Sequence, residues 1–138
     1  MRLMAIVAAV CLAGCVQNKP IYQADPHGPP RELTASEKQA VAATISKGLK
    51  DPSAAIFYWT PANTPTGPSG VVAYCGMING KNSYGGYIGA SPYLASLIYR
   101  DGVAVGAALV DIASDTTTSS AATLLICREN GYDPFSAK

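Results

Sequence analysis

The chain has 138 residues, a length that fits one domain able to bury its own core. Apolar residues make up 49% of it and charged residues only 14%, with 10 basic against 9 acidic side chains. A balance this close to neutral gives no basic surface for nucleic acid and no polybasic patch for anionic lipid, so we exclude both kinds of partner.

The chain begins with an apolar run, LMAIVAAVCLAGC at 3–15, which follows the basic Arg2. This run is shorter than the about 20 residues that a helix needs to cross a bilayer, and its layout is typical of a secretory signal peptide. Its end, Leu-Ala-Gly-Cys at 12–15, resembles the lipobox of bacterial lipoproteins, in which the cysteine is acylated and becomes the first mature residue. The resemblance implies a signal peptide over residues 1–14 and lipidation of Cys15. An ordinary signal peptide that is cut elsewhere is the alternative.

The lipid would set the location of the protein. Two or three acyl chains on Cys15 give firm membrane binding, because each buried methylene contributes about 0.8 kcal/mol. Val16 rather than Asp follows the cysteine, which in lipoproteins of the enteric type implies sorting to the outer membrane. We therefore expect a protein of the cell envelope, anchored through this lipid and facing the periplasm. The next segment, 15–31, is rich in proline and has no hydrophobic periodicity, so it is a tether in which His27 is a spacer residue.

The globular domain, expected over 32–138, begins with a helix at about 35–49. Thr34 and Glu37 have the spacing of a capping box at its start. The Asp-Pro step at 51–52 ends it, because the residue before a proline avoids the helical conformation. Three apolar residues recur at every fourth position along one side of this helix: Val41, Ile45 and Leu49.

Strand patterns occupy most of the remaining chain, at 54–59, 71–79, 83–89, 92–99 and 103–112. The 71–79 segment is apolar at both alternating sets of positions, which is typical of a strand covered on two sides. Asn79-Gly80 predicts a tight turn, Asp101-Gly102 predicts another, and the Gly85-Gly86 pair indicates a bulge. A final helix fits about 119–130, with Gly131 at its C-terminal cap.

This order of elements predicts an α+β fold, a small antiparallel β-sheet with an N-terminal and a C-terminal helix packed on one face. With Cys11 in the leader and Cys15 acylated, Cys75 and Cys127 are the cysteines left in an oxidising compartment, so we expect them to form a disulfide. Leu124 lies three residues before Cys127 on the same helix face, which would turn this cysteine toward the sheet. Two unpaired, buried cysteines are the alternative.

Two segments, LKDPSAAIF at 49–57 and CGMINGKNSYGGYIG at 75–89, resemble a family of small, mostly uncharacterised bacterial exported proteins and lipoproteins. Members carry K-D-P-x-S-A-x-F before C-G-x-V-N-x-K-N-x-[FY]-G-G-Y-x-G. Ser53 and Ala54 stand one position early relative to that spacing. The resemblance implies no established activity and no catalytic residue. The matching positions are Lys50, Asp51, Pro52, Ala54, Cys75, Gly76, Asn79, Lys81, Asn82, Tyr84, Gly85, Gly86, Tyr87 and Gly89.

The 79–89 segment holds the candidate contact surface, formed by Asn79, Lys81, Asn82, Tyr84 and Tyr87. Amides and an amine exchange hydrogen bonds, and tyrosines offer flat amphipathic faces that suit a sugar or a peptide. The alternative is hairpin architecture, in which Asn-Gly makes the turn, the glycines bend a bulged strand and the tyrosines cover the sheet.

No pattern in the chain indicates chemistry. It lacks a nucleophile with an orienting base and paired catalytic carboxylates, and with His27 as the single histidine no Cys/His set has zinc spacing. We therefore expect no catalytic residue, no metal and no cofactor, but a non-catalytic binding or structural module. Its expected partners are the membrane through Cys15 and an envelope protein or cell-wall glycan. The alternative is a periplasmic inhibitor or accessory subunit of an envelope secretion or conjugation assembly.

Overall fold

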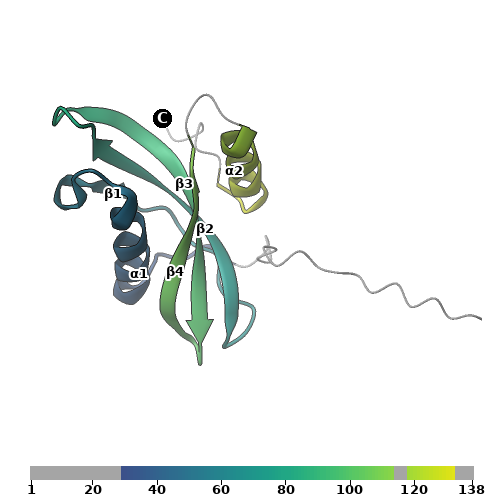
Figure 1. Ribbon diagram of the computed structural model, residues 1–138. Coiled ribbons are helices and arrows are strands. Elements are labelled where there is room, and N and C mark those ends of the chain that lie inside the picture. The colour runs from purple at the N-terminus through teal and green to yellow at the C-terminus, as the bar shows by residue number, and fades with distance from the viewer. Residues whose placement is uncertain (1–28, 114–117, 133–138) are drawn as a thin grey trace, which may run out of the picture.

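The computed structural model describes residues 29–113 and 118–132 (Figure 1). Its strands form one antiparallel sheet in the order β1-β2-β3-β4. A helix at each end of the described chain contacts this sheet, so the predicted α+β fold is confirmed. The elements are α1 (Ala35–Ile45), η1 (Ser46–Gly48), η2 (Pro52–Ala54), β1 (Ile56–Tyr58), β2 (Gly70–Lys81), β3 (Tyr87–Arg100), β4 (Val103–Ile112) and α2 (Thr118–Glu129), where η marks a 3-10 turn.

The two helices lie on opposite faces of the sheet (Figure 1), so the expectation that both pack on one face is wrong. The reason lies in β2, whose consecutive residues 72–76 are apolar or small and therefore give the sheet two apolar faces. Each helix buries one of them. The α1 side includes Val41, Ile45, Val72, Tyr74, Tyr93, Ala95 and Leu97, and the α2 side includes Ala73, Cys75, Leu94 and Cys127.

The capping box predicted at the start of α1 is confirmed. The Thr34 hydroxyl accepts a hydrogen bond from the Glu37 N–H at 3.3 Å, and Glu37 Oε2 accepts one from the Thr34 N–H at 2.7 Å. These two bonds satisfy N–H groups that the first turn of a helix leaves without a partner. No helix among residues 29–113 and 118–132 is long and apolar enough to cross a membrane.

The β3–β4 turn forms where it was predicted, but the β2–β3 turn does not. Asp101 and Gly102 both have positive φ, 51° and 78°, as a two-residue hairpin turn requires. Asn79-Gly80 instead lies within β2, where the strand register shifts between Asn79 and Lys81. The turn between β2 and β3 covers 82–86, and its positive φ of 83° is at Gly85. Asn79-Gly80 therefore lies opposite a bulge, whose extra residue is on β3, where Gly89 has a positive φ of 97°.

Tyr93 packs across Gly76, its partner on β2, and this contact leaves no room for a larger residue. The Tyr93 side chain is fully buried, and a Cβ added to Gly76 would lie 2.5 Å from its Oη. Overpacking of a tight core typically costs about 1–3 kcal/mol. We expect Gly76→Ala to lower the free energy of unfolding by about this amount, measured by urea denaturation.

Gly106→Ala is the matched control, because Gly106 is also a strand glycine and has no atom within 4 Å of its missing Cβ. This variant should unfold at about the same urea concentration as the unmodified chain. Equal stability of the Gly76 and Gly106 variants would show that Tyr93 can move aside at no cost.

Candidate functional site

The β2–β3 hairpin reaches past the end of β4, and its tip is open to solvent (Figure 1). Every residue from 82 to 90 is exposed, and Tyr84 is 97% exposed. Apolar and aromatic side chains with this exposure are available to a partner. The predicted contact residues therefore lie on one projecting arm of the sheet.

Two of the five predicted residues hold the shape of this arm. Asn82 Oδ1 accepts hydrogen bonds from the backbone N–H groups of Tyr84 at 2.9 Å and Gly86 at 3.0 Å. Asn79 Oδ1 accepts one from the Gly89 N–H at 3.1 Å. The side-chain oxygens of both asparagines thus have partners within the hairpin.

Lys81 and Tyr87 connect the arm to the η2 turn. Lys81 Nζ lies 3.8 Å from Asp51 Oδ2 and 5.4 Å from the centre of the Tyr87 ring. The Tyr87 hydroxyl donates to the Ala54 carbonyl at 3.0 Å. Within the part of the chain that the structure describes, the Tyr84 ring has neither a hydrogen bond nor a ring contact. Tyr84 is therefore the predicted contact residue whose side chain is most available.

A hollow lies between the arm and the segment that follows α1. It consists of two adjoining parts of about 310 and 390 Å³, which share Lys50, Lys81, Asn82 and Ser83. The sequence analysis did not assign Lys50 or Ser83 to a site. Only the K-D-P segment of the family resemblance indicated this region, and the fold places it against the arm. Four apolar side chains line the first part: Leu49, Ile78, Ile88 and Ile112.

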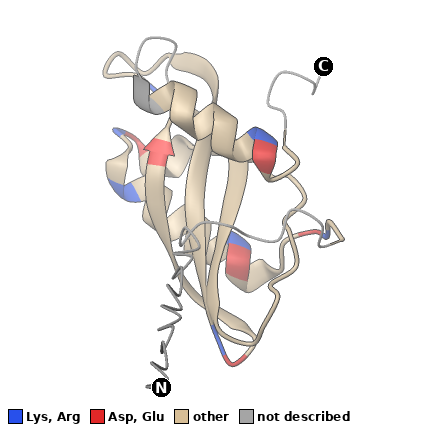
Figure 2. Cartoon of the chain, turned by 90° about the vertical axis from the view of Figure 1, so that its right-hand side faces the viewer, with Lys and Arg blue, Asp and Glu red and all other residues tan. Residues whose placement is uncertain are grey.

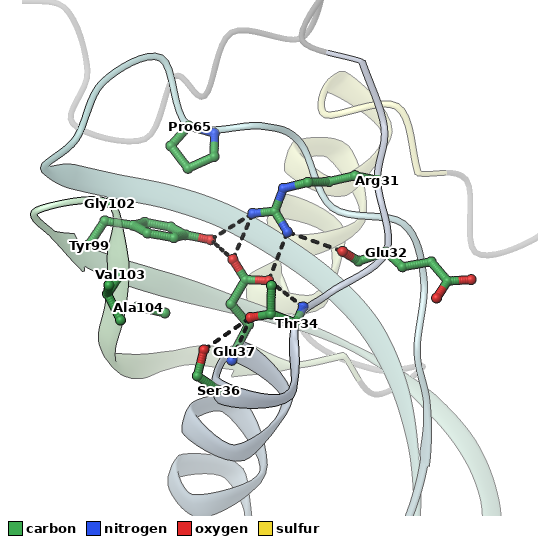
Figure 3. Close-up of a pocket in the computed structure, with 10 residues that line it drawn as sticks. All are labelled: Arg31, Glu32, Thr34, Ser36, Glu37, Pro65, Tyr99, Gly102, Val103 and Ala104. Atoms are coloured by element: carbon green, nitrogen blue, oxygen red, sulfur yellow. Dashed lines mark hydrogen bonds and ion pairs between the residues drawn. The ribbon is translucent and has the colours of Figure 1, made fainter.

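A second pocket, of about 470 Å³, lies at the other end of β3 (Figure 3). Arg31 makes a two-bond ion pair with Glu37, with nitrogen–oxygen distances of 2.6 and 2.8 Å, and donates to the Tyr99 hydroxyl at 3.2 Å. Tyr99 in turn donates to Glu37 Oε1, and Glu37 is only 2% exposed. The cluster joins the start of the described chain to α1 and to β3.

The charges in this cluster stay fixed near neutral pH. Burial by itself would raise the pKa of Glu37, but hydrogen bonds from Arg31, Tyr99 and the Thr34 backbone lower that pKa to about 2. Burial and the neighbouring Glu37 raise the pKa of Tyr99 to about 12. A group with either pKa is a poor general acid or base at pH 7, so the cluster is suited to stabilising the fold.

Glu37 therefore makes the stability of the fold depend on pH in the acid range. Because its pKa is about 2 in the fold and about 4.3 in an unfolded chain, its contribution is fully present above pH 4.3 and disappears as the pH falls toward 2. We expect the unfolding midpoint in urea to drop through this window. A Glu37→Gln variant, less stable at pH 7, should show a smaller drop. An equal drop in both chains would contradict the assigned role of Glu37.

Cys75 and Cys127 form a disulfide, with their Cα atoms 5.7 Å apart. It joins the middle of β2 to α2, as predicted. The lipidation candidate Cys15 lies outside the described residues, as does most of the proposed tether.

Charged side chains are sparse on the domain, and in Figure 2 blue and red segments often adjoin each other. The structure records two ion pairs among the described residues, Arg31–Glu37 and Asp51–Lys81. In the same part of the chain, no group of three or more His, Cys, Asp or Glu side chains could hold a metal ion.

Comparison of this chain with protein-family models, with curated proteins and with solved structures finds no match.

Proposed function

We propose that this protein is a lipid-anchored component of the bacterial cell envelope that acts as a non-catalytic binding module. Its contact surface is the tip of the β2–β3 hairpin. The observation that carries this proposal is the exposure of Tyr84, 97%, on an arm whose other polar side chains hold its shape. A flat aromatic group on a preformed support binds at a low cost in conformational entropy.

The position of the tether supports the same proposal. Arg31, where the tether would join the domain, pairs through its backbone with Ala62 and through its side chain with Tyr99 near the end of β3. The hairpin tip lies at the start of the same strand, roughly 40 Å away at about 3.3 Å per residue. An anchor at one end and a contact surface at the other would point the tip away from the bilayer.

The Cys75–Cys127 disulfide is also in keeping with an exported protein, because such bonds persist in oxidising compartments. Mutation can distinguish Cys15, the proposed anchor, from Cys11 in the leader. We expect Cys15→Ala to block acylation and leave a longer, unlipidated precursor, measured by mass spectrometry of the membrane fraction. Cys11→Ala changes a neighbouring leader cysteine and should be processed normally.

A Cys15→Ala chain that is still cleaved and still partitions with the membrane fraction would rule out Cys15 as the anchor. This outcome would leave the binding proposal in place, because the hairpin tip does not depend on how the chain is held at the membrane.

A further inference from the structure

Part of β3 has a free edge beside the hairpin hollow. β4 pairs with β3 from Tyr93 to Arg100, and the last backbone bond on that side runs from the Ala113 N–H to the Pro92 carbonyl at 2.8 Å. The stretch from Tyr87 to Ser91 pairs with β2 on its other edge and, among the described residues, has no strand beside it where β4 has ended. A free strand edge can take up an extended peptide.

The backbone groups available on this edge follow from the alternation of a strand. Pro92 directs its carbonyl to the β4 side, whereas Gly89 directs its N–H to Asn79 on the β2 side. Residues two apart along a strand face the same edge, so Ala90 directs its N–H and C=O groups to the free side. A bulge then sets four residues of β3, 87–90, against three of β2, 79–81, so the next residue that faces the free side is Tyr87, the partner of Lys81. Both residues are exposed.

The hollow beside this edge has an apolar floor and a basic rim. Ile78 and Ile112 line its floor together with Leu49, and Ile88, 67% exposed, lies at its side. Lys50 and Lys81 line its end at the hairpin. These features suit a ligand with an apolar side chain followed by a negative charge.

Of the two amines, Lys50 is the one without an ion pair in the described part of the chain. Asp51 already has partners, since Lys81 is near its Oδ2 and its Oδ1 accepts hydrogen bonds from the Ser53 hydroxyl and the Ala54 N–H. The charge left over at this end of the hollow is therefore positive. Positive charge favours a carboxylate over a neutral end group.

The direction of the strands determines which end of a bound peptide lies near Lys50 and Lys81. A peptide that continues the sheet where β4 ends would run antiparallel to β3, like β4 itself, from Ile112 toward the hairpin turn. Its last residue would then reach the end of the hollow at Lys50 and Lys81. The free end of this peptide is its carboxylate.

We infer that the free edge of β3 and the adjoining hollow bind the C-terminal tail of a partner protein, as an added strand with an apolar last side chain and a free carboxylate. The inference rests on the proposed function, because it assigns a partner class to the same hairpin arm. Peptide backbone pairs with Tyr87 and Ala90, the last side chain contacts the apolar floor, and Lys50 and Lys81 receive the carboxylate.

The test uses the full chain, labelled with ¹⁵N in detergent solution, and the peptide acetyl-Thr-Val-Thr-Leu with a free carboxylate. We expect its addition to shift the amide resonances of Tyr87, Ala90 and Gly80. The same peptide with a C-terminal amide should bind about fivefold more weakly, which corresponds to loss of one exposed charge pair.

Single substitutions test the amine that receives the carboxylate and the backbone edge separately. Lys50→Gln should weaken binding of the carboxylate peptide about fivefold and leave binding of the amide peptide unchanged. Ala90→Pro removes one backbone donor on the free edge and should abolish binding of both peptides. Arg100→Gln changes an exposed charge at the other end of β3 and should have no effect.

Three results would overturn the inference: no resonance shift at millimolar peptide, equal affinity for the carboxylate and amide peptides, or tighter binding of acetyl-Lys-D-Ala-D-Ala. The last would assign the site to a cell-wall peptide and not to a protein tail. None of them alters the expectation for Tyr84 and an envelope partner, so failure of this inference is distinguishable from failure of the proposed function.

Discussion

Arg31→Ala is expected to lower the free energy of unfolding by about 1.5–3 kcal/mol at pH 7, the range for losing hydrogen bonds to a charged group, because Glu37 is buried but the Arg31 side chain is 30% exposed. Without Arg31, the Glu37 carboxylate stays buried and loses both of its guanidinium hydrogen bonds, leaving those from Tyr99 and the Thr34 N–H. Urea denaturation followed by circular dichroism measures the effect.

A second variant tests whether the loss comes from the unpaired charge. Arg31→Ala combined with Glu37→Gln should recover part of the stability, because a neutral amide costs less to bury than a carboxylate. Arg100→Ala, which removes an exposed arginine, should change stability by less than about 0.5 kcal/mol. A fully additive double variant would show that Arg31 and Glu37 do not act together.

Removal of the disulfide is the other large expected effect. The bond closes a loop with a sequence separation of 52, which in the chain-entropy model is worth about 4 kcal/mol. The buried cluster under α2 is small: Ala73, Cys75, Leu94 and Cys127. We therefore expect Cys75→Ala with Cys127→Ala to destabilise the domain by about this amount and to loosen α2 first.

Hydrogen exchange measures this order of events. The amides of α2 should exchange much faster in the double cysteine variant, while those at the centre of β3 keep most of their protection. Equal acceleration in α2 and β3 would contradict local release of the helix. Normal exchange in both would show that packing alone holds α2 on the sheet.

The features that the sequence predicted well each depend on a few residues. The capping box depends on Thr34 and Glu37, three residues apart, and the β3–β4 turn on the adjacent pair Asp101-Gly102. The disulfide was predicted from which cysteines remain in an oxidising compartment, an argument that needs no geometry. Each of these predictions could be made from a few residues that are close in sequence or few in number.

The features that the sequence analysis got wrong depend on competition between residues. Asn79-Gly80 has good turn chemistry, but Asn82 with Gly85 makes a turn that extends both strands, so Asn-Gly stays within β2, opposite a bulge in β3. The helices were expected on one face although the two-sided apolar pattern of 71–79 already favoured cover on both faces. In the structure α1 covers one of these faces and α2 covers the other.

The site was predicted only in part, because its pockets combine distant segments. The 79–89 residues were found from their composition, whereas Lys50 reaches the same hollow from about thirty residues earlier in the chain. Arg31 and Tyr99 are 68 residues apart, and no spacing rule connects them. Such pairs become visible only when the sheet register is known.

The central claim is that Tyr84 recognises a partner in the envelope. The direct test is capture of partners from detergent-solubilised envelope by the intact chain, by Tyr84→Ala and by Leu125→Ala, which truncates an exposed side chain on α2. We predict that Tyr84→Ala melts normally but loses a partner that the intact chain and Leu125→Ala both retain. An unchanged set of partners with Tyr84→Ala, or a loss of stability like that of a core variant, would contradict the claim.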